Sequence, residues 1–388
     1  MKILVITFSR GLNPGTFMQA YGVKMGLLKI FPDAEIEYLK FPDFKRNLGV
    51  RGAHDSIANV VKQKMYAAYR LLKYKRLEKT HFTYTRAIDL FDYAEQDARN
   101  LLAKYDLVVV GSDTILEKAE SDDHQRIGLN WGTVNLCQAK HIFFAASASP
   151  ARFSHDGPLL PKLKQCVEKF SYIGLRDDLT IHLFRDQLGI SPERLVKQPD
   201  PSYFLDVTQF KLGKHYADKL EGQKSALCNF GSNCPFRRAM VDLLREKGYY
   251  VVSTSYNPYA DLSIDTIDAK EWAGVFSLVD LVVTERFHDS VFALRNSKPV
   301  VAVDWDEGRF AAAGDSKTYR ILEDYGLTDL HFNLSSADMT SIAYAIDHLN
   351  DIFCREYVGK KNQEMQERLS SIMQTIKMDL KADAGRSV

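Results

Sequence analysis

The stretch "DLVVTERFHDS", from Asp280 to Ser290, runs from a short apolar segment straight into charged and titratable side chains. A chain that only turned at the surface here would carry Gly, Asn or Pro, and the stretch contains none of them. Near-continuous apolar strands belong to parallel sheets that are covered on both faces. The stretch therefore predicts a parallel α/β sheet with Arg286, His288 and Asp289 at the end of one strand.

Similar apolar segments lie on both sides of this stretch and alternate with helical patterns. Those before residue 200 read "KILVITF", "AEIEYLKF", "DLVVVGS" and "KHIFFAASA", and those after it read "KSALCNF", "YYVVSTS" and "PVVAVDW". This alternation predicts two Rossmann-like, doubly wound α/β halves. Because such sheets bind ligands off the carboxyl ends of their strands, the crevice between the halves is the predicted site.

The segment "KQPDPSYFLD", from Lys197 to Asp206, has two prolines and few helix signals, and it predicts the linker between the halves. We accordingly expect an N-terminal α/β domain over residues 1–200. A C-terminal α/β domain with the Arg-Phe-His motif is expected over residues 201–345. Residues 346–388 are expected to form a C-terminal helix and a tail.

The composition of the 388-residue chain is ordinary for a globular protein, with 45% hydrophobic and 26% charged residues. The chain has 51 Lys and Arg residues and 50 Asp and Glu residues, so it has almost no excess of positive charge. No nucleic-acid partner is therefore expected. No apolar run reaches the ~18–20 residues that span a bilayer, and the N-terminus reads as a strand, which predicts a cytoplasmic protein. The five cysteines form no CxxC pair, and no metal is predicted.

One segment is unusual in its charge. Lys62 to Lys79, "KQKMYAAYRLLKYKRLEK", carries many Lys and Arg against one Glu, with interleaved tyrosines. Such a segment is typical of a solvated helix whose long side chains cover apolar surface. It also fits a surface for anionic lipid headgroups or for a lipid-linked pyrophosphate substrate. Both interpretations stay open at the level of sequence.

Small, polar or charged residues follow several of the predicted strands. They are Asn13 and Gly15 before the first helix, then Gly111, Ser112 and Asp113, then Arg176, then Arg286, His288 and Asp289, and finally Arg309. Strand ends are often polar simply because the chain surfaces there. At the first of them, however, free N–H groups at the start of a helix favour an anion.

The convergence of cations on these strand ends favours an anionic ligand. Three of the ends supply an arginine, and one supplies a histidine. Arginine binds phosphate and carboxylate through paired hydrogen bonds, and histidine delivers a proton near neutral pH. A ligand with both groups, such as phosphoenolpyruvate, fits this set, although these residues alone do not choose it over a sugar nucleotide.

Six segments in order resemble the polysaccharide pyruvyl transferase family, roughly from Asn13 to Leu327. They are "NPGTFMQAYGV", "YDLVVVGSD", "FFAASASP", "GLRDDLT", "PDPSYFL" and "LVVTERFHDSVFAL" with its following "KPVVAV". The resemblance implies a two-domain fold similar to GT-B glycosyltransferases. It also implies transfer of the pyruvyl group of phosphoenolpyruvate onto two hydroxyls of a surface-polysaccharide sugar as a ketal, with release of phosphate and with no cofactor.

The resemblance also assigns roles to residues of this chain. Arg176, Arg286, His288 and the cation after the next strand match the family's functional positions. The resemblance assigns the last of these to Arg309, with Lys317 as the alternative. His288 is then the expected acid, the arginines the expected anion clamps, and Asp113 or Asp289 the expected base. The sugar acceptor is expected to be free or lipid-linked, the latter placing the protein at the inner face of the membrane.

The chain departs from the family pattern at two places. Relatives continue Gly-Ser-Asp with Gln-x-Trp-Asn, whereas this chain reads "TILEKAES". The residue after the histidine is usually Gly, and here it is Asp289, an adjacent carboxylate that favours imidazolium. Two alternatives therefore stand beside the transferase: a GT-B-like glycosyltransferase that uses a nucleotide sugar, and a non-catalytic member of the family.

Overall fold

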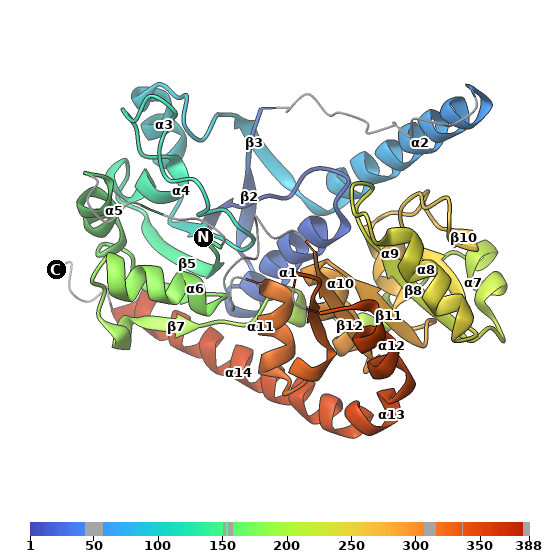
Figure 1. Ribbon diagram of the computed structural model, residues 1–388. Helices are drawn as coiled ribbons and strands as arrows, with labels where there is room; N and C mark the ends of the chain where they lie inside the picture. Colours follow the sequence, from blue (N-terminus) through green and yellow to red (C-terminus); the bar gives the residue numbers. More distant parts are fainter. Residues whose placement is uncertain (43–56, 150–152, 154–157, 306–315, 336, 383–388) are drawn as a thin grey trace.

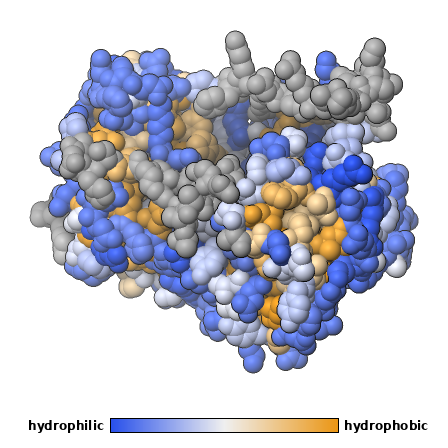
Figure 2. Space-filling view, viewed as in Figure 1, coloured by the Kyte–Doolittle hydropathy of each residue, from blue (hydrophilic) through white to orange (hydrophobic). Residues whose placement is uncertain are grey.

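The computed structural model describes residues 1–42, 57–149, 153, 158–305, 316–335 and 337–382, with the backbone alone for 57–63 and 381–382. Two parallel β-sheets form the centres of two domains, and helices pack against both (Figure 1). Hydrophilic residues dominate the face drawn in Figure 2, and apolar residues show between them in both domains. The two α/β halves that the sequence predicts are thus confirmed.

Within the described residues, the N-terminal sheet has seven parallel strands in the order β3-β2-β1-β4-β5-β6-β7. Its strands are β1 (Lys2–Ile6), β2 (Glu35–Lys40), β3 (Thr83–Ala87), β4 (Leu107–Val110), β5 (Lys140–Ala146), β6 (Tyr172–Leu175) and β7 (Leu195–Lys197). Its helices are α1 (Pro14–Ile30), α2 (Ile57–His81), α3 (Glu95–Leu102), α4 (Leu129–Gly132), α5 (Leu159–Val167) and α6 (Asp178–His182). The strand order reverses between β1 and β4, which makes their carboxyl ends a topological switch point.

The C-terminal sheet has the order β10-β9-β8-β11-β12-β13 among the residues described, again all parallel. Its strands are β8 (Ser225–Asn229), β9 (Tyr250–Ser253), β10 (Leu262–Ser263), β11 (Leu281–Thr284), β12 (Val300–Asp304) and β13 (His331–Asn333). Its helices are α7 (Lys214–Leu220), α8 (Arg237–Glu246), α9 (Ala269–Val275), α10 (Phe287–Arg295), α11 (Lys317–Asp324), α12 (Met339–Asp347) and α13 (Leu349–Ile352). Its switch point lies between β8 and β11.

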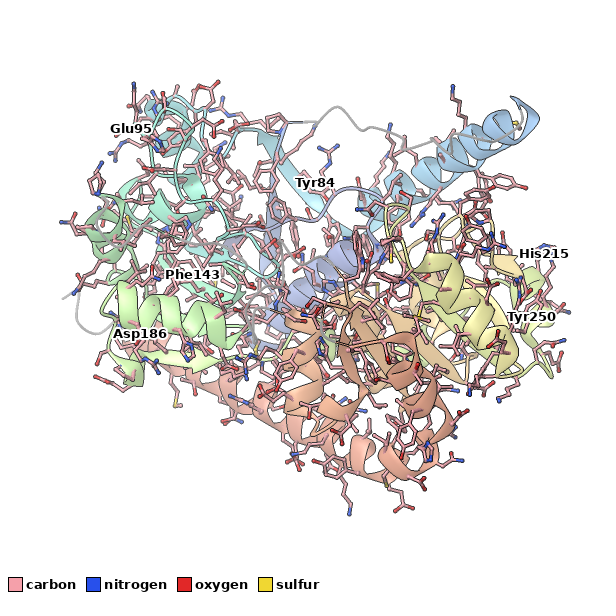
Figure 3. The ribbon with its side chains drawn as sticks, in the orientation of Figure 1. Tyr84, Glu95, Phe143, Asp186, His215 and Tyr250 are labelled. Atoms are coloured by element: carbon pink, nitrogen blue, oxygen red, sulfur yellow. The ribbon has the colours of Figure 1, made fainter. Side chains whose placement is uncertain are left out.

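The central strands are buried along their whole length, which explains their continuous apolar sequences. Every residue of β4, β11 and β12 is buried. In the N-terminal core, Phe143 of β5 lies inside the domain (Figure 3), and its ring stacks on Phe170 with centroids 3.9 Å apart. Burial on both faces is what a helix-covered parallel sheet requires.

The linker between the domains is packed, not loose. Two short 3-10 turns form it, Pro201–Phe204 and Val207–Gln209. An added Cβ on Gly22 of α1 would lie only 2.2 Å from the carbonyl oxygen of Pro201. From the other domain, Arg295 at the end of α10 donates hydrogen bonds to the carbonyl oxygens of Ser202, at 2.5 Å, and Leu205. The linker therefore touches both domains along its length.

A final helix, α14 (Arg355–Ala382), runs along both domains (Figure 1). Asn362 donates to the carbonyl oxygen of Leu294 at 2.9 Å and accepts from the hydroxyl of Tyr325 at 2.7 Å. Near the other end of the helix, Lys140 of the first sheet donates to the carbonyl oxygen of Leu380. The predicted C-terminal helix is present, and the predicted tail after it, residues 383–388, lies outside the described residues.

Four edge strands, β3, β7, β10 and β13, were not predicted from the sequence. They are two to five residues long and half-exposed in most positions. Short strands of this kind lack the apolar run or the alternation by which a strand is recognised. Within the described part of the chain, no helix combines the length and the apolar character needed to cross a membrane.

Candidate active site

A cleft of about 600 Å³ lies between the two domains. The first domain lines it with Leu12, Asn13, Pro14, Gly15, Arg70, Asp113, Ser149 and Arg176. The second lines it with Asn233, Ser255, Trp272, Glu285, Arg286, Phe287, His288, Asp289, Trp305, Lys317 and Thr318. Most of these residues follow a parallel strand, so the cleft lies where the carboxyl edges of the two sheets face each other, as the two-domain pattern predicts.

His288 reaches this cleft from the first turn of α10, whose N-cap residue is Arg286. Its ring packs against α1 of the other domain. An added Cβ on Gly15 would lie 2.4 Å from Nδ1 of His288, a distance that no side chain tolerates. Gly15 is therefore required sterically, because it lets the imidazole of one domain rest on the helix of the other.

The carboxylate that faces His288 is Asp200, which directly precedes the linker turn. Its Oδ2 lies 3.6 Å from Nε2 of His288, an ion-pair distance longer than a hydrogen bond, and 3.4 Å from Nη1 of Arg176. Its Oδ1 accepts a hydrogen bond from the backbone N–H of Ser202 at 2.9 Å. The linker thus supplies one carboxylate to a cation of the first domain and a titratable ring of the second.

Burial alone would raise the pKa of the Asp200 carboxyl, but the neighbouring His288 and Arg176 outweigh it and hold that pKa below its usual value. Arg176 is itself shielded, with 4% of its side chain exposed, and its guanidinium lies 4.8 Å from the centroid of the Phe287 ring. Arg176 already contacts a carboxylate and an aromatic ring. It can therefore hold Asp200 in place as well as contact a ligand.

Asp113 follows β4 and lines the cleft from the first domain. Burial would raise the pKa of its carboxyl, but Arg176, His288 and Lys317 together lower it. The hydroxyl of Thr16 donates to Oδ2 of Asp113 at 3.2 Å. The carboxylate is thus ionised and close to the cations of the cleft, which suits acceptance of a proton from a hydroxyl.

Lys317 brings a further cation to the cleft from the start of α11. Burial, with the charge of Arg176, lowers the pKa of its amine to about 8, although Asp113 acts in the opposite direction. A buried network holds this helix start: Thr318 donates to Asp304 at 3.1 Å, and Nε2 of His331 lies 2.8 Å from the other carboxylate oxygen. Lys317 therefore occupies a fixed position, whereas Arg309, the other candidate for this cation, lies outside the described residues.

The guanidinium of Arg286 differs from that of Arg176 in having no paired carboxylate among the described residues. Its backbone N–H donates to the hydroxyl of Thr284 at 3.0 Å. Its guanidinium lines the cleft, and it makes no hydrogen bond or ion pair with any residue that the structure describes. All of its donors are thus available to a ligand.

Asn13, Gly111 and Ser112 support the cleft structurally. Oδ1 of Asn13 accepts from the N–H groups of Gly15, at 3.0 Å, and Thr16, at 3.4 Å, so these donors are already engaged at the start of α1. Ser112 is fully buried and bonded to Gln19. Gly111 has φ +117°, and an added Cβ would lie 2.6 Å from the carbonyl oxygen of Phe144. Gly111 and Ser112 lie outside the lining of the cleft.

Asp289 is turned toward the strand ends. Its carboxylate accepts hydrogen bonds from Asn229 at 2.8 Å and from Thr284 at 2.9 Å. Burial raises the pKa of this carboxyl, although Arg286 acts in the opposite direction. The carboxylate beside the imidazole is Asp200, which sequence reasoning placed in the linker and did not count as a site residue. The signal was its position between the two prolines of "PDPSYFL".

Comparison with models of known protein families shows to which family the chain belongs. The family model described as polysaccharide pyruvyl transferase matches residues 13–307, well over half of the sequence. The chain belongs to the polysaccharide pyruvyl transferase family. The match spans the cleft residues from Asn13 to Trp305, and it confirms the resemblance found in the six motifs. A comparison with curated proteins finds no significant match.

Solved structures similar to this pyruvyl transferase family member share its two-domain, GT-B-like fold at low sequence identity. A Listeria monocytogenes protein assigned as a UDP-N-acetylglucosamine 2-epimerase has a TM-score of 0.58 at 11% identity, covering 98% of this chain and 97% of that one. The Anabaena protein HepE, solved with UDP and glucose, has 0.56 at 14%, covering 98% and 100%. A Rickettsia africae glycosyltransferase has 0.52 at 12%, covering 99% and 97%.

Metal binding has no visible basis in the described residues of this pyruvyl transferase family member. Among them, no group of three or more His, Cys, Asp and Glu side chains is arranged to hold a metal ion. The cleft is lined by cations, among them Arg286 and Lys317, and by carboxylates such as Asp113.

Replacement of Asp200 by Asn tests the buried ion-pair centre. Removing the carboxylate takes away the one that forms an ion pair with the buried guanidinium of Arg176, so we expect a loss of about 3 kcal/mol in the free energy of unfolding at pH 7. Because the folded-state pKa of Asp200 is lowered, its contribution is complete above the ordinary carboxyl pKa of about 4 and is lost as the pH falls below that value. Urea unfolding of both proteins from pH 8 to pH 3.5 measures the difference, which should stay constant down to about pH 5 and then shrink. A difference that grows in acid would refute the assignment.

Proposed function

We propose that this protein transfers the pyruvyl group of phosphoenolpyruvate onto two hydroxyls of a sugar in a bacterial surface polysaccharide or its precursor. The observation that carries the proposal is that one interdomain cleft holds the Arg-x-His pair of the family motif, Arg286 and His288, together with Arg176, Lys317 and Asp113. An anion with two charged groups needs cations on more than one side, and the cleft has them.

His288 is the proton donor in this proposal. A proton passes from the imidazolium to the methylene carbon of phosphoenolpyruvate, and the central carbon becomes an oxocarbenium ion. A sugar hydroxyl attacks that carbon and gives up its proton to Asp113. The bond between the carbon and the phosphate oxygen then breaks, and phosphate leaves with the proton that Asp113 accepted. The second hydroxyl attacks the oxocarbenium ion formed again at that carbon, gives its proton to the neutral imidazole of His288 and closes the ketal. Asp200 holds the ring in position through the 3.6 Å contact with Nε2.

The cations of the cleft act on the donor's two anionic groups. Arg286 has its guanidinium unengaged among the described residues, and Lys317 lines the same cleft from the start of α11. In the proposed reaction they hold the phosphate and carboxylate and stabilise the charge that develops on the departing phosphate. Arg176 holds Asp200 in place through the 3.4 Å ion pair, and it also lines the cleft itself.

His288→Ala tests the assignment. We expect the variant to lose ketal formation while binding phosphoenolpyruvate within about tenfold of the wild type, or ~1.4 kcal/mol, because the ring acts on the reacting carbon and not chiefly on the anionic groups. The measurement is incubation with phosphoenolpyruvate and a panel of lipid-linked or nitrophenyl sugars, followed by mass spectrometry for the pyruvyl ketal and an assay for phosphate. Near-normal turnover in the variant would remove His288 as the acid.

A glycosyltransferase that uses a nucleotide sugar is the second candidate, because solved proteins with this fold include one that was crystallised with UDP and glucose. The two candidates differ in their donors. Phosphoenolpyruvate should raise the melting temperature of this protein, whereas UDP and CMP should not. The opposite pattern would favour the glycosyltransferase, and stabilisation by none of them would favour a non-catalytic member of the family.

We further propose that the outer face of α2 contacts an anionic membrane surface and so places a cytoplasmic enzyme beside lipid-linked acceptors. The helix projects from the body of the molecule (Figure 1). Not all of its basic residues are available: Nζ of Lys73 pairs with Glu271 of the other domain at 2.5 Å. Its outward residues are basic and apolar together, namely Lys64, Met65, Tyr69, Leu72, Lys75, Arg76 and Lys79. This mixture suits a headgroup layer.

The triple variant Lys75→Gln, Arg76→Gln and Lys79→Gln tests the membrane contact. Each exposed cation near an anionic surface contributes about 1 kcal/mol at low salt, so the variant should sediment less with phosphatidylglycerol-containing liposomes. Its activity on a short soluble sugar should be unchanged. The control replaces three exposed lysines elsewhere, Lys104, Lys162 and Lys219, by Gln and should sediment like the wild type. Equal sedimentation of the wild type, the triple variant and the control would refute the membrane contact, and α2 would then be a solvated helix.

A further inference from the structure

The inner side of α2 carries a cation that the site described above does not use. Arg70 lines the interdomain cleft, although it lies far from the family motifs in sequence. Its Nη2 donates a hydrogen bond to the carbonyl oxygen of Leu12 at 3.0 Å, and its guanidinium lies 5.6 Å from the centroid of the Tyr74 ring. These two contacts fix the guanidinium beside the loop that leads into α1.

The hydrogen-bonding capacity of Arg70 is incompletely used. Its Nε is shielded from solvent and, like the neighbouring Tyr74 hydroxyl, has no partner in hydrogen-bonding geometry among the described residues. No carboxylate among them forms an ion pair with Arg70. Lys73, one turn further along the same helix, does have a carboxylate partner in Glu271. A shielded donor without a partner is costly, which points to a ligand that completes the hydrogen bonds of Arg70.

Arg70 and Arg286 act on the same region although they come from different domains. Burial raises the pKa of the Tyr74 hydroxyl to about 12, and both Arg70 and Arg286 act in the opposite direction, which places both charges near this one side chain. Nε1 of Trp272, another residue of the cleft lining, is also buried without a hydrogen-bond partner. The lining of the cleft therefore includes two arginines and an indole N–H that the described residues leave unsatisfied.

The other cations of the cleft lie near carboxylates. Arg176 is paired with Asp200, and Lys317 and His288 lie near Asp113 and Asp200. An anion with two charged groups gains most where cations lack counter-charges. Arg70 and Arg286 are thus the two arginines of the cleft lining that lack a paired carboxylate among the described residues.

We propose that Arg70 is a ligand-binding residue that forms, with Arg286, a two-domain clamp for the oxyanions of the donor. The proposal rests on phosphoenolpyruvate being that donor. The guanidinium fork suits carboxylate or phosphate, and α2 holds it in place through Leu12 and Tyr74. The inner side of α2 thereby serves the cleft, while its outer side faces away from it.

Calorimetric titration with phosphoenolpyruvate tests the clamp in the full-length protein. Arg70→Gln should lower the affinity at least tenfold, and Arg70→Lys should give an intermediate loss, because it keeps the charge and loses the fork. Arg238→Gln, an exposed arginine on α8, is the matched control and should bind like the wild type. Separate titrations with inorganic phosphate and with pyruvate show which oxyanion Arg70 holds, since only one of the two affinities should fall.

The outcomes separate this inference from the proposed function. If Arg286→Gln weakens phosphoenolpyruvate binding and Arg70→Gln does not, the clamp is refuted and the function stands. If Arg70→Gln changes only the KM for the sugar, Arg70 belongs to the acceptor and the clamp is refuted. If the wild type does not bind phosphoenolpyruvate at all, the proposed function fails, and the clamp fails with it. Should Arg70→Gln not fold, the intermediate loss expected of Arg70→Lys decides the question.

Discussion

The buried carboxylate of Asp200 is the interaction on which the rest of this structure depends. It lies between a guanidinium from one sheet edge and an imidazole from the other domain, at 3.4 Å and 3.6 Å. A carboxylate with 1% of its side chain exposed is tolerated only when charges compensate it. Because Asp200 belongs to the linker, this compensation ties the path of the linker to the position of the candidate acid.

Close backbone approach at α1 completes the same arrangement. Gly15 makes room for the ring of His288, and Gly22 makes room for the carbonyl oxygen of Pro201. Any larger residue at either position would push a domain or the linker away from the helix. The helix therefore serves as a shared wall, and the cleft has a defined shape because the linker and the second domain both rest on it.

Much of this could be predicted from the sequence, because the central strands of a covered parallel sheet are apolar along their whole length. The same rule placed Arg286, His288, Asp113 and Arg176 at strand ends, where they line the cleft. Edge strands such as β10 and β13 escaped prediction, since two or three half-exposed residues carry no pattern.

Two residues of the site could not be found in this way. Asp200 lies in a segment whose prolines predict a linker, and Arg70 lies in a segment whose charge predicts a solvated helix. Their roles depend on which charges are paired in the folded chain, and pairing across domains leaves no local pattern. Asp289 shows that adjacency in sequence can also mislead. It follows His288 in the chain, but its carboxylate accepts hydrogen bonds from Asn229 and Thr284.

The most direct test of the central claim, that the acid of this cleft protonates the methylene carbon of phosphoenolpyruvate, is the reaction in deuterated water. The wild-type enzyme should form a ketal whose methyl group carries one deuterium, because the imidazolium exchanges its proton with solvent before transfer. Mass spectrometry of the isolated ketal measures this directly. A ketal without deuterium in its methyl group would contradict the account.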